Sequence, residues 1–360
     1  MNTTPFTPLK LLRHGDRVEA MLRGETVFPI SVELDLSNKC PHDCPFCSFG
    51  TSASQGYRQQ YWVTFPTPRI YTLLEELKEV GVKSVTFTGG GEPLVHRAAA
   101  SIFEKATQVG LQWGVVTNGY LLRGDVASWI AKHATFVRVS LDAGSAETHA
   151  FTHGLPPGQF QFSIILDQMR HCRELAGPRL TIGAGYCVME ENWREIYRAA
   201  QLVKEHGGNY LEVRPTFPTE WRGDGWGQAL QPESVEAAKH EIAHAKTHLN
   251  DDTFQVIGMV ERFDLLAHPH KTYDQCRIGP LMTVIGADAR GWHCCVMRGQ
   301  EGFSWGDVKA QSFKQAWLAA QRHLAAAEID VKKCPRCRYD GFNTLIQGAF
   351  IEGRMHQDFL

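Results

Sequence analysis

Six short strand-like segments, separated mainly by helical patterns, occupy the first 220 residues and constrain the fold more than any other feature. They are Ile30–Leu36, Ser84–Thr88, Gln112–Thr117, Phe136–Leu141, Arg179–Val188 and Tyr210–Val213. Strands that alternate with helices form a parallel sheet wound by right-handed βα units. The sequence therefore predicts an α/β fold, a partial (β/α)6 parallel barrel, in which ligands bind at the carboxyl ends of the strands.

The first helix is predicted from one apolar face, and it ends near Gly81. The apolar residues recur at the i, i+3, i+4, i+7 spacing of a helix and are Ile70, Leu73, Leu74, Leu77 and Val80. A second helix is predicted over about 97–109, and Asn192 is placed to cap another between the last two strands.

The regular alternation ends after the sixth strand. Residues 217–232 are rich in Gly, Pro and Trp and predict a connector, followed by a helix at 233–249 and a strand at 254–257. From Tyr273 onward the pattern is irregular and cysteines return. We divide the chain into an N-terminal extension (1–27), a core (28–220), a connector with a helix (221–272), a small cysteine-containing domain (273–345) and a tail (346–360).

Composition excludes several classes of protein. Of the 360 residues, 43% are hydrophobic and 21% charged, which favours a packed core over disorder. With 37 basic and 39 acidic residues the chain has no global basic footprint for nucleic acid. It also shows neither a signal peptide nor a membrane span. We therefore expect a cytoplasmic protein without a nucleic-acid or membrane partner, in which ten cysteines favour metal or redox chemistry.

The first cysteine group follows the first predicted strand. Cys40, Cys44 and Cys47 form a C-x3-C-x2-C run, so three thiolates can face one metal centre. Structural zinc usually takes four ligands, and His42 could supply the fourth. An iron–sulfur cube held by three thiolates would instead leave one iron open to an exogenous ligand. The sixteen histidines are otherwise scattered, and the sequence reveals no convincing metal pair among them.

Polar residues follow the next three predicted strands. The second strand ends in Thr88-Gly-Gly-Gly-Glu92-Pro93, the third in Thr117-Asn118-Gly119, and the fourth in Ser140-Leu-Asp142. Each could be ordinary turn chemistry. Together with an open cluster at the same edge of the sheet, however, they predict a ligand site in which glycines allow close backbone approach and carboxylates offer polar contacts.

These motifs resemble those of the radical S-adenosylmethionine (radical SAM) superfamily. The similarity lies in the CPHDCPFC run, the TGGGEP, TNG and SLDAG strand ends, and their order over residues 28–215. The resemblance implies that Cys40, Cys44 and Cys47 ligate a [4Fe–4S] cluster whose open iron binds SAM. It also implies that the cofactor-binding residues are Phe46, beside the adenine, Gly90, Gly91 and Glu92, near the methionyl amino group, and Thr117, Asn118, Ser140, Asp142 and Arg214. An electron donor such as flavodoxin or ferredoxin would be a partner.

A second cysteine group lies in the last quarter of the chain. By count alone, four of its thiolates suit structural zinc or a fully ligated [4Fe–4S] cluster equally well. The region resembles the twitch or SPASM extensions of radical SAM enzymes, which carry auxiliary clusters. That resemblance implies a second [4Fe–4S] cluster ligated by Cys276, Cys294, Cys334 and Cys337. The remaining cysteines are then spare: Cys172, Cys187 and Cys295.

The function predicted from the sequence is that of a radical SAM oxidoreductase acting on a small polar substrate, such as a carbohydrate or aminocyclitol. An auxiliary cluster would accept the second electron of a dehydrogenation. The alternative is a peptide or protein maturase, and a more distant one is a non-catalytic metal scaffold. The sequence identifies no catalytic residue, although the candidates to accept a proton from the substrate radical include Tyr186, Glu212, Glu220 and Arg222.

Overall fold

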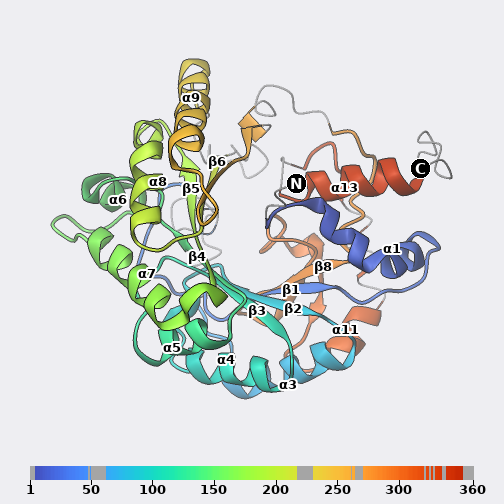
Figure 1. Ribbon diagram of the computed structural model, residues 1–360. Coiled ribbons are helices and arrows are strands. Elements are labelled where there is room, and N and C mark those ends of the chain that lie inside the picture. The colour runs from blue at the N-terminus through green and yellow to red at the C-terminus, as the bar shows by residue number, and fades with distance from the viewer. Residues whose placement is uncertain are drawn as a thin grey trace.

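The structure is a computed structural model that describes residues 5–47, 49, 62–216, 230–260, 262–263, 271–319, 322–323, 326, 329–334 and 338–351. Within these residues a single sheet has the strand order β10-β9-β8-β1-β2-β3-β4-β5-β6-β7 (Figure 1). The strands are β1 (Ser31–Asp35), β2 (Ser84–Thr88), β3 (Gln112–Thr117), β4 (Phe136–Ser140), β5 (Thr181–Val188), β6 (Tyr210–Pro215), β7 (Gln255–Gly258), β8 (Met282–Ile285), β9 (Arg290–Trp292) and β10 (Ser304–Asp307).

Strands β1 to β6 are parallel and lie side by side in chain order, as the sequence predicts. Helices cover the outer face of the curved sheet (Figure 1). They include α3 (Thr67–Glu79), α4 (Ala99–Gln108), α5 (Gly124–His133), α6 (Ala146–Thr152), α7 (Phe162–Ala176), α8 (Ile196–Glu205) and α9 (Pro232–Leu249). The predicted α/β partial barrel is therefore confirmed.

The main core lies between the sheet and these helices. The apolar stripe of α3 is fully buried at Ile70, Leu73, Leu74 and Leu77. Glycines let the β-strands accept large aromatic neighbours: a Cβ on Gly114 would collide with the ring of Phe136, and one on Gly183 with the ring of Tyr210. Close packing of this kind fixes how neighbouring strands lie against each other.

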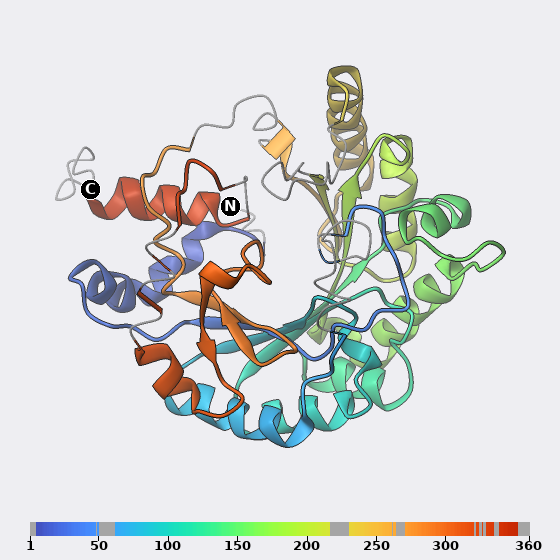
Figure 2. The same cartoon turned by 180° about the vertical axis from the view of Figure 1, so that it is seen from behind.

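The C-terminal part of the chain continues the same sheet. Strand β8 pairs in parallel with β1, so that Leu34 lies opposite Ile285, and β8, β9 and β10 then form an antiparallel meander (Figure 2). A cluster of aromatic rings packs behind the meander, where Trp305 and Trp317 are buried. The remaining helical elements are η1 (Pro8–His14), α1 (Gly15–Leu22), η2 (Pro93–Val95), η3 (Gly177–Arg179), η4 (Trp193–Glu195), η6 (Glu301–Phe303), α11 (Phe313–Leu318), α13 (Asp340–Ile346) and η7 (Gln347–Ile351).

One local prediction is wrong. The side chain of Asn192 does not cap the helical segment that follows it, which begins as the short 3₁₀-helix η4. Its Nδ2 instead donates to the carbonyl oxygens of Asp142 at 3.0 Å and Cys187 at 2.9 Å, and its Oδ1 accepts from the amide of Met189 at 2.8 Å. The side-chain amide of Asn192 thus satisfies buried backbone groups at the ends of β4 and β5, and it is not available to cap a helix.

Across the described ranges, we find no helix with both the length and the apolar character that crossing a membrane requires.

Candidate functional site

A cavity of about 1330 Å³ runs along the inside of the barrel. At the carboxyl ends of the strands it is lined by nearly all of the residues that the sequence singles out for the first cluster and SAM. They are Cys40, Cys44, Phe46, Cys47, Gly91, Glu92, Thr117, Asn118, Ser140, Asp142 and Arg214. Gly90 lies just behind this surface, where its amide is 3.3 Å from Oδ2 of Asp35.

The loop that carries Cys40, Cys44 and Cys47 is held by one backbone hydrogen bond to the segment after β2 and by another within the loop itself. The amide of Glu92 donates to the carbonyl of Lys39 at 2.8 Å, and the amide of Cys47 donates to the carbonyl of Cys44 at 3.0 Å. All three cysteines are half-buried and line the same cavity. This donor set fits a cluster held by three thiolates.

Close approach between this loop and the glycine-rich strand end explains one of the glycines. A Cβ on Gly91 would collide with the Lys39 carbonyl oxygen. Only glycine therefore lets the end of β2 lie directly against the cysteine loop.

Glu92 ties the ends of β2 and β3 together from a buried position. Its Oε1 accepts hydrogen bonds from the Thr117 hydroxyl at 2.6 Å and the Leu94 amide at 3.0 Å, and its Oε2 accepts from the Asn118 amide at 2.7 Å. Burial raises the pKa of Glu92 to about 7, although these hydrogen bonds oppose the shift. Through its three hydrogen bonds the Glu92 carboxyl group holds the ends of β2 and β3 in position beside the cavity.

Asn118 offers a donor that the described protein does not use. Its Oδ1 accepts from the Tyr120 amide at 3.0 Å, but its Nδ2 is buried without a hydrogen-bond partner in the described part of the chain. A buried donor without a partner is costly unless a ligand satisfies it. Its position in the cavity wall fits the SAM site that the sequence predicts.

Asp142 adopts a left-handed backbone conformation (φ 53°) immediately after β4. Its Oδ1 accepts from the amide of Cys187 at 2.6 Å, and burial raises the pKa of Asp142 to about 6. The carboxyl group thus joins β4 to β5 at the edge of the cavity. Ser140, the last residue of β4, lines the same cavity as Asp142.

Arg214 lies in the cavity wall beside a buried carboxylate. Oε2 of Glu212 is 3.0 Å from Nη1 of Arg214 and 2.6 Å from Nη1 of Arg138. Burial tends to raise the pKa of Glu212, but Arg138, Arg214 and Arg262 together lower it. Glu212 is thus held as a carboxylate counter-ion.

None of the other predicted proton acceptors is placed by the structure at the cavity surface. Tyr186 is fully buried, and its hydroxyl donates to the carbonyl of Asn192 at 2.6 Å, so it acts as a structural tie. Glu220 and Arg222 lie outside the described residues.

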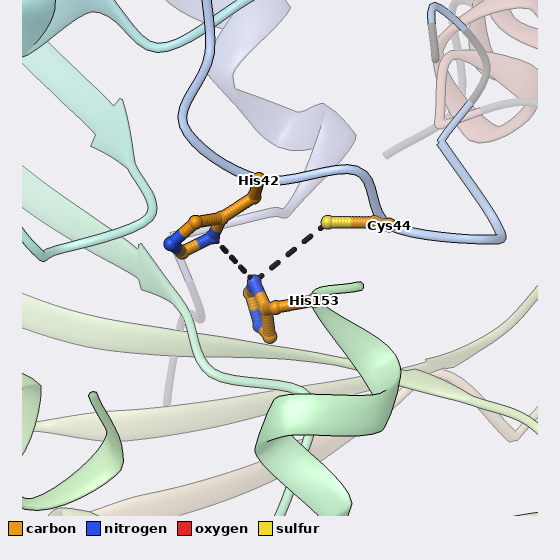
Figure 3. A group of neighbouring side chains, drawn as sticks. All are labelled: His42, Cys44 and His153. Carbon is orange, nitrogen blue, oxygen red and sulfur yellow. Dashed lines mark hydrogen bonds between the residues drawn. The ribbon is translucent and has the colours of Figure 1, made fainter. Parts of the chain in front are cut away.

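A group of histidines that the sequence analysis regarded as scattered converges beside Cys44 (Figure 3). Nδ1 of His153 is 3.0 Å from Nδ1 of His42 and 3.7 Å from Sγ of Cys44. His149 stacks on His153 with ring centroids 4.1 Å apart. The ligand atoms of His42, Cys44 and His153 lie within 4.8 Å of one another, so His42 groups with Cys44 and a second histidine rather than with the full cysteine run.

A buried ion pair joins the end of β1 to the C-terminal segment. Oδ2 of Asp35 is 3.1 Å from Nε of Arg298, and both side chains are almost completely buried. The Arg298 guanidinium also lies over the ring of Phe49, 4.6 Å from its centroid. This pair was not predicted from the sequence, although two acidic residues in one buried strand, Glu33 and Asp35, were the available signal.

A second, smaller cavity contains the described members of the second cysteine group. It is enclosed by mainly apolar atoms, and its lining includes Cys276, Cys294, Cys295 and Cys334. Cys337 lies outside the described residues. Burial raises the pKa values of Cys276 and Cys334. Cys295 also lines the large cavity, with its Sγ 3.8 Å from Nη2 of Arg338, whereas Cys294 lines only the small one.

The partial barrel brings three cysteines and a glycine-rich strand end to the same end of the sheet, an arrangement that fits a barrel protein with an iron–sulfur cluster and a bound ligand. Residues 34–203 match the sequence profile of the Radical SAM superfamily. The match implies a [4Fe–4S] cluster and SAM as cofactors.

Curated relatives share part of the chain. A PqqA peptide cyclase from Rhodopseudomonas palustris is 31% identical over 157 residues, which are 43% of this chain and 39% of that protein. A PqqA peptide cyclase from Granulibacter bethesdensis is 21% identical over 228 residues, or 61% of this chain and 56% of that protein. The matches thus span less than two thirds of either relative.

Solved structures share the fold at low sequence identity. Streptococcus suis SuiB bound to S-adenosylmethionine superposes with a TM-score of 0.67 at 14% identity, over 91% of this chain and 74% of that chain. The structure of anSMEcpe with bound AdoMet gives a TM-score of 0.60 at 15% identity, over 88% of each chain.

Proposed function

We propose that this chain is a radical SAM enzyme that modifies a peptide or protein. The observation that carries the proposal is the 31% identity to a PqqA peptide cyclase over 157 residues. It favours the maturase alternative over the carbohydrate or aminocyclitol dehydrogenase that the sequence analysis put first.

The chain's own residues would position the reaction. Cys40, Cys44 and Cys47 would hold three irons of the cluster, and Glu92 would keep the glycine-rich strand end in place beside it. With SAM bound and the cluster reduced by one electron, reductive cleavage of SAM would release methionine and supply a 5′-deoxyadenosyl radical that can remove a hydrogen atom from the substrate. The barrel walls would hold the reacting hydrogen in place and exclude water.

We also propose that Cys276, Cys294, Cys334 and Cys337 hold an auxiliary [4Fe–4S] cluster. Three of these cysteines line one small apolar cavity, and a buried, largely apolar setting of this kind surrounds many iron–sulfur sites. The auxiliary cluster would accept the electron that a substrate radical loses in an oxidation. Zinc remains the alternative occupant.

The function is tested by incubating the anaerobically reconstituted enzyme with SAM, a reductant and the short peptides encoded by genes that neighbour its own. We expect 5′-deoxyadenosine and a peptide that is lighter by two hydrogen atoms, detected by mass spectrometry. A reaction without SAM is the control. Unchanged peptides together with oxidation of a sugar or aminocyclitol panel would reverse the proposal in favour of the small-molecule reading.

A further inference from the structure

The large cavity is not confined to the carboxyl rim where the cysteines lie. Its lining also includes residues at the opposite, amino-terminal ends of the strands, namely Ser31, Ser84, Gln112, Thr181 and Tyr210, each the first residue of its strand. The segment before α1 lies at this end too, since Phe6 packs edge-on against Tyr210 with ring centroids 5.6 Å apart. The barrel therefore has a second mouth, remote from the cluster loop.

This amino-terminal mouth is basic. Lys10, Arg13, Lys78 and Lys83 line the cavity there, and all four are exposed. We call these four residues the basic rim. The carboxylates among the described lining residues are Glu33, Glu92, Asp142 and Glu212, which lie within the strands or beyond their carboxyl ends. The rim thus concentrates positive charge in a chain whose formal net charge is −2.

Two of the rim cations lie close enough to act on His14. The pKa of His14 is lowered by burial and by Arg17, with smaller contributions from Lys83 and Arg13, while Asp16 raises it. Like charges gathered at one opening produce a local field that attracts an anionic partner and speeds its association.

Positive charge continues into the barrel beyond the rim. The Glu212 carboxylate is shared between Arg138 and Arg214, and Arg262 also lines the cavity near it. Asp142 also interacts with Arg214 and Arg138, so these guanidinium groups are shared between two carboxylates. An acidic peptide that passed the rim would meet guanidinium groups whose charge is partly balanced.

We infer that the amino-terminal mouth is a docking site for an acidic peptide segment, whose carboxylates contact the basic rim while the chain enters the barrel. The inference rests on the proposed function and specifies its substrate class. A peptide suits the geometry because the rim lies beside one opening of a long cavity that continues to the carboxyl ends of the strands. Nucleic acid would require a more extended basic surface.

The inference is tested by fluorescence anisotropy with the reconstituted enzyme and three labelled probes of equal length. The probes are a glycine peptide with several glutamates, the same peptide with glutamines, and the same peptide with lysines. We expect the acidic probe to bind most tightly, and its affinity to fall as salt is raised. The double variant Arg13→Glu/Lys83→Glu should weaken its binding by about tenfold or more.

A matched variant controls for the change in overall charge. Lys132→Glu/Arg170→Glu alters two exposed cations on the outer helices α5 and α7, and it should bind the acidic probe like the unaltered enzyme. Equal affinity for the acidic and glutamine probes, or unchanged binding by the rim variant, would overturn the inference. Tighter binding of an oligonucleotide that displaces the acidic probe would overturn it too. Because this assay measures binding alone, a failure of peptide modification would be seen separately, in the mass assay.

Discussion

Replacement of Arg298 by Met should destabilise the protein by roughly 3–5 kcal/mol, since it leaves the Asp35 carboxyl group buried without its charged partner. Asp35 is fully buried at the end of β1, and Arg298 comes from the C-terminal segment. Even with Arg298 present, burial raises the pKa of Asp35 to about 6. Urea unfolding of the full chain would measure the loss.

The pH dependence of this loss has a defined sign. A buried carboxyl group whose pKa is raised binds its proton more tightly in the folded state than in the unfolded state. The unfavourable contribution of Asp35 to stability therefore grows as the pH rises from its ordinary pKa of 3.8 to about 6. It is relieved again as the pH falls through the same range. The deficit of the Arg298→Met variant should accordingly shrink in acid.

Two further variants separate the buried pair from simple loss of an arginine. The double variant Asp35→Asn/Arg298→Met removes both charges and should recover much of the stability. Arg170→Met removes the arginine of an exposed pair with Asp167 and should change stability by less than about 1 kcal/mol. Equal losses in Arg298→Met and Arg170→Met would contradict a buried ion pair.

Iron and sulfide analysis should show about eight of each per chain in the reconstituted enzyme, and about four of each after Cys276→Ala/Cys334→Ala. The two cysteines line the small cavity of the second cysteine group, so their removal should abolish the auxiliary cluster and leave the first one intact. Cys172→Ala is the matched control, because this buried thiol belongs to α7 and should leave both clusters in place. About four irons and one zinc in the unaltered protein would show that the second group is a zinc site.

Local sequence patterns were sufficient to predict the barrel. Strands β2 and β3 have the bounds expected from the sequence, because short β-branched runs flanked by glycine or polar residues carry their own signal. The residues at the carboxyl rim could also be named, since the ends of parallel strands meet at one edge of the sheet.

The features that the sequence did not reveal depend on contacts between distant segments. The parallel pairing of β8 with β1 and the ion pair between Asp35 and Arg298 each join residues far apart in the chain. The same is true of His42 and His153, which meet only because the cysteine loop packs against α6. No local periodicity encodes such partners, so their chemistry appears only when the chain is folded.

The central claim is that Cys40, Cys44 and Cys47 support reductive cleavage of SAM. Its most direct test is the yield of 5′-deoxyadenosine from the reduced enzyme and SAM, compared with the Cys40→Ala/Cys44→Ala/Cys47→Ala variant, whose folding is checked by circular dichroism. We expect the unaltered enzyme to form 5′-deoxyadenosine and the folded variant to form none above background. Formation of 5′-deoxyadenosine by the variant at the rate of the unaltered enzyme would contradict the claim.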